Sequence, residues 1–134
     1  MSHISPVNPP ALYSAAPYDY AARVGPGALL FTAGACPLDP TGRVTQIGDL
    51  EGQARTALAN LDAVLVEAGA SHADLVRTTV YVAGTPTDLV TVWDVVAAHL
   101  APHRPPSTLL GVAALGYANQ LVEIDAVAAL GDER

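Results

Sequence analysis

The end of the chain alternates between apolar and acidic residues, reading Val-Glu-Ile-Asp-Ala-Val-Ala over residues 122–128. This pattern predicts a β-strand, in which successive side chains point to opposite faces. Glu123 and Asp125 then share one face, and the apolar residues between them share the other, which is typical of a core. The acidic face is expected to meet a cavity, water or another subunit, because a carboxylate in a closed interface must be paired or must change its protonation state.

Similar alternation predicts further strands, separated by turn signals rich in Gly and Pro. The turn Gly25-Pro26-Gly27 joins the first two of them, so we expect these two strands to form a hairpin. The predicted strands span residues 21–24, 28–34, 43–46, 75–82, 107–113 and 120–128.

Two other stretches carry apolar residues at the spacing of an α-helix. The first helix is predicted over residues 50–67, with Asp49 as its N-cap and Gly69 just beyond its C-terminus. The second is predicted to begin after a cap formed by Thr87 or Asp88 and to run to about residue 100, where prolines stop it.

The order of these elements predicts an α+β domain in which two helices lie on one face of a mixed sheet. Its length favours a single domain over residues 1–134. Residues 1–14 are expected to form an N-terminal arm and residues 129–134 a loose tail. The second face of the sheet would be bare in a monomer, which favours association through that face.

The amino-acid composition favours association between copies of the chain and disfavours some kinds of binding partner. Hydrophobic residues make up 51% of the chain and charged residues 14%, which leaves little charge to cover a monomer. The net charge is −7, Lys is absent and the six Arg residues are dispersed, which argues against nucleic acid and anionic membranes as partners. The single Cys excludes an intrachain disulfide. Without a recognisable signal peptide or membrane span, the protein is expected to be cytoplasmic.

Four candidate reactive residues have more ordinary explanations. His99 and His103 have the spacing of metal ligands on a helix, but Pro102 lies between them and no third ligand is evident nearby, so no metal site is expected. Cys36 has no evident base and is expected to be a small buried thiol. Ser107 lacks the motif that surrounds a nucleophilic serine and is expected to line a cleft or to cap a strand.

Glu123 and Asp125 leave two interpretations open. In the first, a carboxylate positions a water molecule or accepts a proton. In the second, the two carboxylates belong to a solvated sheet face or form ion pairs with Arg77 or Arg104.

Several segments together resemble the RidA (YjgF) family. They are Ala16-Pro17-Tyr18 and residues 30–42, 75–82, 104–115 and 122–128, and their order and spacing match over roughly residues 15–128. The resemblance implies a chorismate-mutase-like α+β fold. Three subunits would pack their sheets into a central barrel, with the helices outside and a small-molecule cleft at each subunit interface. It also implies hydrolysis of reactive enamines and imines, such as 2-aminoacrylate, to 2-keto acids and ammonia without a cofactor.

The resemblance assigns the site as well. In family members, an Arg at the start of the penultimate strand grips the substrate carboxylate, a task that suits a bidentate guanidinium. Ser107 stands at that position here. Arg104, three residues earlier, is expected to point elsewhere and could reach the cleft only if Pro105 and Pro106 redirect the chain. The acid that orients the attacking water corresponds to Asp125, and a pocket tyrosine corresponds to Tyr18.

Two further positions depart from the family pattern. A family Ser in the first hairpin becomes Ala33, and a family Asn on the second helix becomes Trp93. The indole either fills the cleft or packs the helix against the sheet. Losing the charge-assisted contact to the carboxylate costs about 1.5–3 kcal/mol, or roughly one to two powers of ten in affinity. The expected catalytic residues are Asp125 and Tyr18, and the expected ligand-binding residues are Ser107, Trp93, Ala33, Arg104 and Glu123.

These departures leave two functions open. The first is hydrolysis of an imine or enamine other than 2-aminoacrylate, with a substrate that is bulkier or more apolar. The second is a binding module that holds a small metabolite without turnover, suggested by the missing Arg. Ribonuclease activity has also been attached to the family, and the acidic, Lys-free composition disfavours it here. The expected partners are a small molecule and further copies of the chain in a homotrimer, with no cofactor.

Overall fold

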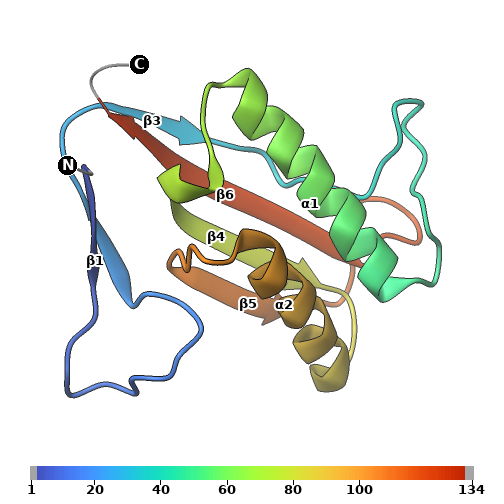
Figure 1. Ribbon diagram of the computed structural model, residues 1–134. Helices are drawn as coiled ribbons and strands as arrows, with labels where there is room; N and C mark the ends of the chain where they lie inside the picture. Colours follow the sequence, from blue (N-terminus) through green and yellow to red (C-terminus); the bar gives the residue numbers. More distant parts are fainter. Residues whose placement is uncertain (1–2, 132–134) are drawn as a thin grey trace.

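The structure is a computed structural model that describes residues 3–131. It contains seven strands or helices that the sequence analysis anticipated, together with one N-terminal strand and one short 3-10 helix (Figure 1). In chain order the elements are β1 (Ile4–Val7), β2 (Ala21–Val24), β3 (Ala28–Phe31), α1 (Leu50–Glu67), η1 (His72–Asp74), β4 (Leu75–Val82), α2 (Pro86–Leu100), β5 (Ser107–Gly111) and β6 (Val122–Gly131).

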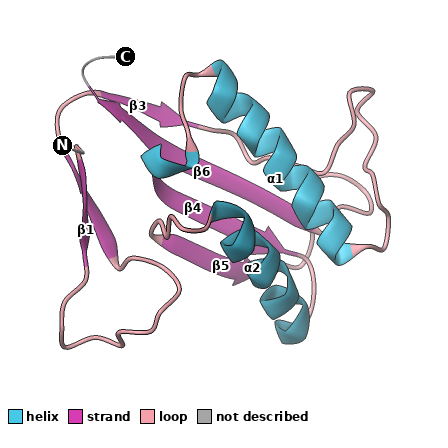
Figure 2. Cartoon of the chain, viewed as in Figure 1, coloured by secondary structure: helices cyan, strands magenta, loops and turns pink. Residues whose placement is uncertain are grey.

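The main sheet has the strand order β3-β6-β4-β5. Strand β6 pairs antiparallel with β3 and β4, whereas β4 and β5 run parallel. Both helices cover the same face of this sheet (Figure 2). The predicted architecture, two helices on one face of a mixed sheet, is therefore confirmed.

The predicted hairpin between the strands that flank Gly25-Pro26-Gly27 is wrong. Strand β2 pairs with β1 in a separate two-stranded sheet, with Ile4 opposite Val24, while β3 pairs with β6. Gly27 has a φ of +142°, and a side chain there would collide with the backbone of Gly131. The turn thus carries the chain from one sheet to the other, and β1 lies in the segment expected to be an arm.

Helix α1 has the predicted bounds because local signals define both of its ends. The Asp49 side chain accepts a hydrogen bond from the backbone N–H of Gly52 at 3.0 Å. Beyond the C-cap, Gly69 has a φ of +75°, a conformation that glycine adopts without strain. The side chains that α1 buries against the sheet are Ala54, Ala57, Leu58, Leu61 and Leu65.

Helix α2 begins slightly earlier than predicted, and its cap is neither Thr87 nor Asp88. Thr85 is the N-cap: its hydroxyl accepts from the N–H of Asp88 at 3.3 Å, and the Asp88 carboxylate accepts from the N–H of Thr85 at 2.9 Å. These two bonds form a capping box, and Pro86, directly after the cap, has a fixed φ that suits the first helical position.

The core lies between the two helices and the sheet. Val80, Val82, Val122 and Ile124 point toward the helices and are fully buried. The opposite side of the sheet, which we call the open sheet face, carries Phe31, Thr79, Tyr81, Leu110, Glu123 and Asp125, as the strand register and alternation require. Phe31 is 71% exposed and Leu110 43% exposed, so this face presents apolar surface beside its carboxylates.

A buried glutamine fixes the loop that leads into β6. Gln53 of α1 is fully buried; its amide group donates to the carbonyl of Asn119 at 2.9 Å, and its carbonyl accepts from the N–H of Leu121 at 2.7 Å. Because both bonds are made to backbone, the start of β6 and hence Glu123 are held against α1.

Other strand boundaries differ from the prediction at their ends. Strand β6 continues to Gly131, so residues 129–131 of the expected loose tail belong to it, while residues 132–134 lie outside the described residues. Residues 43–46 contribute an isolated bridge between Leu38 and Val44 rather than a strand. Within residues 3–131, neither helix has the length and apolarity to span a membrane.

Candidate functional site

A hollow lies beside β5, one of the two edge strands of the main sheet. Its volume is about 370 Å³. We call it the edge hollow; it is lined by Pro17, Tyr18, Trp93, Ser107, Thr108 and Leu109. The structure therefore brings three of the expected site residues, Tyr18, Trp93 and Ser107, into one place, from the loop before β2, from α2 and from β5.

The lining of the edge hollow includes two aromatic rings and the hydroxyl of Ser107. The Tyr18 and Trp93 rings meet edge to face with centroids 6.4 Å apart. The Ser107 hydroxyl shares a hydrogen bond with that of Thr78 at 2.6 Å and donates to the Pro105 carbonyl at 2.9 Å. The Ser107 hydroxyl therefore has hydrogen-bond partners within the chain itself, and the residue lines the hollow without needing a ligand to complete its hydrogen bonds.

Arg104 lies closer to this region than expected. It lines a second hollow of about 370 Å³ that shares Trp93 and Ser107 with the edge hollow. Its guanidinium lies 3.8 Å from the Asp19 carboxylate, and its carbonyl accepts from the N–H of Asp19 at 2.9 Å. A cation therefore lies at the second hollow, and the Asp19 carboxylate partly neutralises it.

Asp125 lies on the open sheet face, where the Tyr81 hydroxyl donates to it at 2.9 Å. This hydrogen bond, followed by burial and the negative charge, raises the pKa of Tyr81. Asp125 is paired across the sheet with Thr79, which is paired with Thr108 of the edge hollow. Two strand spacings separate Asp125 from Thr108, about 10 Å. Within one chain, Asp125 lines neither the edge hollow nor the hollow that contains Arg104.

Glu123 is held more tightly than Asp125. Its Oε1 accepts from the Cys36 thiol at 3.2 Å and from the Gln120 amide at 3.1 Å. The carboxylate lies directly over Gly34, where any side chain would collide with it. Among the described residues, Glu123 and Asp125 thus have hydrogen-bond partners and no ion pair with Arg77 or Arg104.

The Cys36 thiol is partly buried, and its surroundings favour the protonated form. Burial, followed by the hydrogen bond to Glu123 and its charge, raises the thiol pKa from 9.0 to about 11. Because the protonated thiol is favoured in the fold, its stabilising contribution is complete below about pH 9 and is lost as the pH rises toward 11.

We expect iodoacetamide to alkylate Cys36 more slowly in the folded protein than in the urea-unfolded chain at mildly alkaline pH. Glu123→Gln should raise the folded rate, by about tenfold for each unit that the pKa falls. Mass spectrometry of timed samples measures both rates. Equal rates in the folded and unfolded wild-type chain would contradict the hydrogen-bonded, protonated thiol.

The remaining expected site residue and the histidine pair are elsewhere. Ala33 is exposed in the loop after β3 and lines neither hollow at β5. His99 and His103 diverge: His99 bonds to Asp62 at 2.7 Å and His103 to the carbonyl of Leu75 at 2.8 Å.

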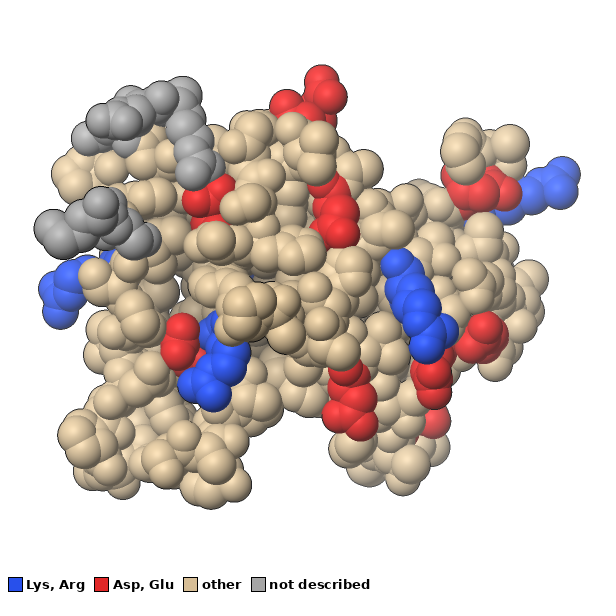
Figure 3. Space-filling model, viewed as in Figure 1, with Lys and Arg blue, Asp and Glu red and all other residues tan. Residues whose placement is uncertain are grey.

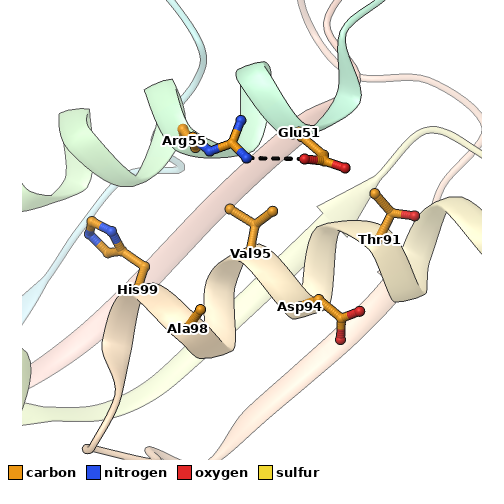
Figure 4. Close-up of a pocket in the computed structure, with 7 residues that line it drawn as sticks. All are labelled: Glu51, Arg55, Thr91, Asp94, Val95, Ala98 and His99. Carbon is orange, nitrogen blue, oxygen red and sulfur yellow. Dashed lines mark hydrogen bonds and ion pairs between the residues drawn. The ribbon is translucent and has the colours of Figure 1, made fainter.

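A groove of about 560 Å³ separates α1 from α2 on the outer side of the molecule (Figure 4). Its lining includes the exposed ion pair Glu51–Arg55, at 3.0 Å, and the carboxylate of Asp94. None of the residues expected at the ligand site lines it.

The Arg residues are dispersed along the chain and over one face of the molecule. On the face shown in Figure 3, the Arg side chains stand apart from one another and several lie next to Asp or Glu. This face has no basic patch of the kind that binds a phosphate backbone.

Known proteins match both the sequence and this fold. The sequence profile of the family described as Endoribonuclease L-PSP matches residues 9–130. A RutC family protein of Pyrococcus abyssi is 34% identical over 113 residues, which cover 84% of this chain and 85% of that protein. The 2-iminobutanoate/2-iminopropanoate deaminase of Salmonella typhimurium is 35% identical over 113 residues, covering 81% of this chain and 85% of the deaminase.

The crystal structure of YyfB, a Rid family protein of Yersinia pestis, superimposes with a TM-score of 0.89 at 32% identity, covering 96% of this chain and all of that one. This chain belongs to the RidA (YjgF/RutC) family. The resemblance identified from the ordered motifs is therefore confirmed, and so is the RidA-type fold.

Sequence reasoning missed the partners that surround the RidA motif positions. Alternation along β4 places Tyr81 on the same face as Thr79, but only the register between β4 and β6 shows that Tyr81 bonds to Asp125. Asp19 follows the recognisable Tyr18, yet nothing in the sequence indicates its contact with Arg104. Neither contact has a local signal, because each joins residues far apart in the chain.

Proposed function

We propose that this RidA family protein hydrolyses a reactive imine or enamine other than 2-aminoacrylate, without a cofactor. Water adds to the C=N carbon, the C–N bond breaks, and the products are a carbonyl compound and ammonia. The observation that carries the proposal is the lining of the edge hollow, where all six side chains are uncharged and two are aromatic. This lining favours an apolar or uncharged group where other family members hold a carboxylate.

The proposal includes a homotrimer with its clefts at the subunit interfaces. The exposed Phe31 and Leu110 on the open sheet face support it, because packing against further copies would bury them. A shared cleft also removes a difficulty of the single chain, in which Asp125 lies on the open sheet face about 10 Å from Thr108. Asp125 would then position the attacking water, and Tyr18 would shape the pocket.

The relatives support the reaction class. One of them is named as a 2-iminobutanoate/2-iminopropanoate deaminase, and this chain covers most of its length. The departure at Ser107 is the reason for proposing a different substrate within that class. The cytoplasmic location and the absence of a nucleic-acid partner remain predictions.

A second function, a non-catalytic module that binds a small metabolite, is favoured by one specific observation. Among the described residues, the lining of the two hollows at β5 includes no Asp or Glu. If no neighbouring subunit brings a carboxylate to the hollow, a ligand can be held there without an acid to activate water.

The test is a panel of imines with an unsubstituted nitrogen, generated in solution by an amino-acid oxidase or by a flavin-dependent amine oxidase. Half of the panel carries an α-carboxylate, and the other half carries an alkyl or aryl group in its place. Ammonia release is followed with and without purified protein. We expect acceleration over the spontaneous reaction for the imines without a carboxylate, and less or none for 2-aminoacrylate.

No acceleration with any imine would overturn the enzymatic proposal. The binding module would then be supported by a ligand that quenches Trp93 fluorescence and is recovered with unchanged mass after long incubation. Trp93 is the single Trp in the chain, so its fluorescence reports on the edge hollow and on the second hollow that it also lines.

A further inference from the structure

Three side chains from three separate elements converge on the helix-covered side of the molecule, away from the open sheet face. Asp62 comes from α1, His72 from η1 and His99 from the last turn of α2. Nε2 of His72 lies 2.6 Å from Asp62 Oδ1, and Nε2 of His99 lies 2.7 Å from Asp62 Oδ2. One ligand atom from each residue lies within 4.8 Å of the other two.

We propose that Asp62, His72 and His99 form a binding site for a late first-row divalent metal ion such as Zn²⁺. Two imidazole nitrogens and one carboxylate oxygen are a donor set that Zn²⁺ and its neighbours in the series accept. Mg²⁺ and Ca²⁺ prefer oxygen ligands and are not expected to bind. The site is independent of the proposed deaminase activity.

The geometry requires only small changes to admit the ion. Tetrahedral Zn²⁺ with bonds of about 2.0–2.1 Å places its ligand atoms about 3.3 Å apart. With Asp62 Oδ1 as the carboxylate ligand, its 2.6 Å distance to His72 Nε2 would open by less than about 1 Å. One ligand atom from each of the three residues already lies within 4.8 Å of the other two. Coordination through Nε2 needs the neutral imidazole with its proton on Nδ1, so the two hydrogen bonds to Asp62 are replaced by bonds to the metal.

The site is also accessible. The side chains of His72, Asp62 and His99 are 32%, 33% and 33% exposed, which leaves a path for the ion and room for a water as fourth ligand. Figure 4 shows His99 at one end of the groove between the helices, with its ring directed toward α1. The two imidazole rings have centroids 5.1 Å apart and are tilted by 55°, so both can direct a nitrogen to one point.

The metal would join α1, η1 and the end of α2. In the sequence, Asp62 and His72 are separated by the α1 C-terminus, and His99 lies in another helix. A bound ion would stabilise the helix layer because it binds the folded site and finds no preformed site in the unfolded chain.

The experiment is calorimetric titration of tag-free, chelator-treated protein with Zn²⁺, with Mg²⁺ in a parallel titration. We expect one Zn²⁺ per chain, no response to Mg²⁺ and a higher melting temperature with Zn²⁺. His72→Gln and Asp62→Asn should each weaken Zn²⁺ binding by at least about tenfold. His3→Gln is the matched control, because His3 also bonds through Nε2, at 2.7 Å to the carbonyl of Ala129, outside the site.

A second readout does not depend on stability. Co²⁺ in a four-coordinate site gives intense visible absorption bands, which should appear with wild type and His3→Gln and be absent with His72→Gln. Far-UV circular dichroism checks that each variant folds. The proposal is overturned if wild type binds no Zn²⁺ at stoichiometric concentration, or if His72→Gln and Asp62→Asn, both folded, bind as tightly as wild type.

Discussion

Replacement of Asp125 by Asn is expected to lower kcat by about 10²–10⁴-fold for the imine that the protein hydrolyses fastest, the range typical of a lost general acid or base. The amide keeps an oxygen that can accept the hydrogen bond from Tyr81, which is 2.9 Å long in the wild type. The fold should therefore persist, and the loss should be chemical. Initial rates of ammonia release measure it.

The same substitution has a spectroscopic signature. The hydrogen bond to Asp125 is the largest cause that raises the Tyr81 pKa, and the negative charge adds to it. Without that charge, the Tyr81 hydroxyl should ionise at lower pH. The difference in phenolate absorbance between wild type and Asp125→Asn along an alkaline titration should show it, and a Tyr81→Phe variant assigns the signal.

Two matched substitutions separate the possible explanations. Asp94→Asn removes a carboxylate from the groove between the helices and should leave kcat unchanged. Glu123→Gln removes the other carboxylate of the open sheet face, and its effect is expected to be smaller than that of Asp125→Asn. If Glu123→Gln abolishes turnover while Asp125→Asn does not, the water-positioning role belongs to Glu123.

The sequence predicted most accurately the elements whose signals are local. Helix α1 has its predicted bounds because Asp49 and Gly69 define its ends within a few residues of chain. Strand β6 has the predicted division into a buried face and a face with Glu123 and Asp125, because that division follows from alternation alone.

The pairing of strands that are far apart in the chain could not be predicted from the sequence. A turn of Gly-Pro-Gly indicates that the chain changes direction, but it does not say which strand the next one joins, and β3 joins β6 rather than β2. The candidate site shows the same division. Tyr18, Trp93 and Ser107 were identified from family motif positions, whereas the contact of Arg104 with Asp19 depends on a backbone hydrogen bond across 85 residues.

Restoring the cation at position 107 is expected to raise kcat/KM for 2-aminoacrylate by about 10–100-fold, the equivalent of about 1.5–3 kcal/mol for one charge-assisted contact. In Ser107→Arg, the longer side chain can extend from β5 into the edge hollow, where the Trp93 ring offers a surface for the guanidinium plane. Ser107→Gln is the control for side-chain bulk without charge and should give no gain.

The substitution has a cost that can be measured separately. Ser107 shares a 2.6 Å hydrogen bond with Thr78, which is fully buried. Removing the Ser107 hydroxyl leaves the Thr78 hydroxyl without that partner, so Ser107→Arg and Ser107→Gln should both lower the free energy of unfolding by about 1–3 kcal/mol. Urea denaturation of both variants measures this loss. A gain in kcat/KM confined to Ser107→Arg is then attributable to the charge.

The interpretation of the Ser107→Arg result depends on whether Arg104 already binds the substrate carboxylate in the wild type. Its guanidinium already lines the hollow next to Ser107, held 3.8 Å from Asp19. If Arg104 served as the carboxylate anchor, wild type would already process 2-aminoacrylate, Arg104→Gln would abolish that activity, and Ser107→Arg would add little. If the anchor is absent, Arg104→Gln changes little and only Ser107→Arg creates the activity. Because the Asp19 carboxylate competes for the Arg104 guanidinium, we expect the second pattern.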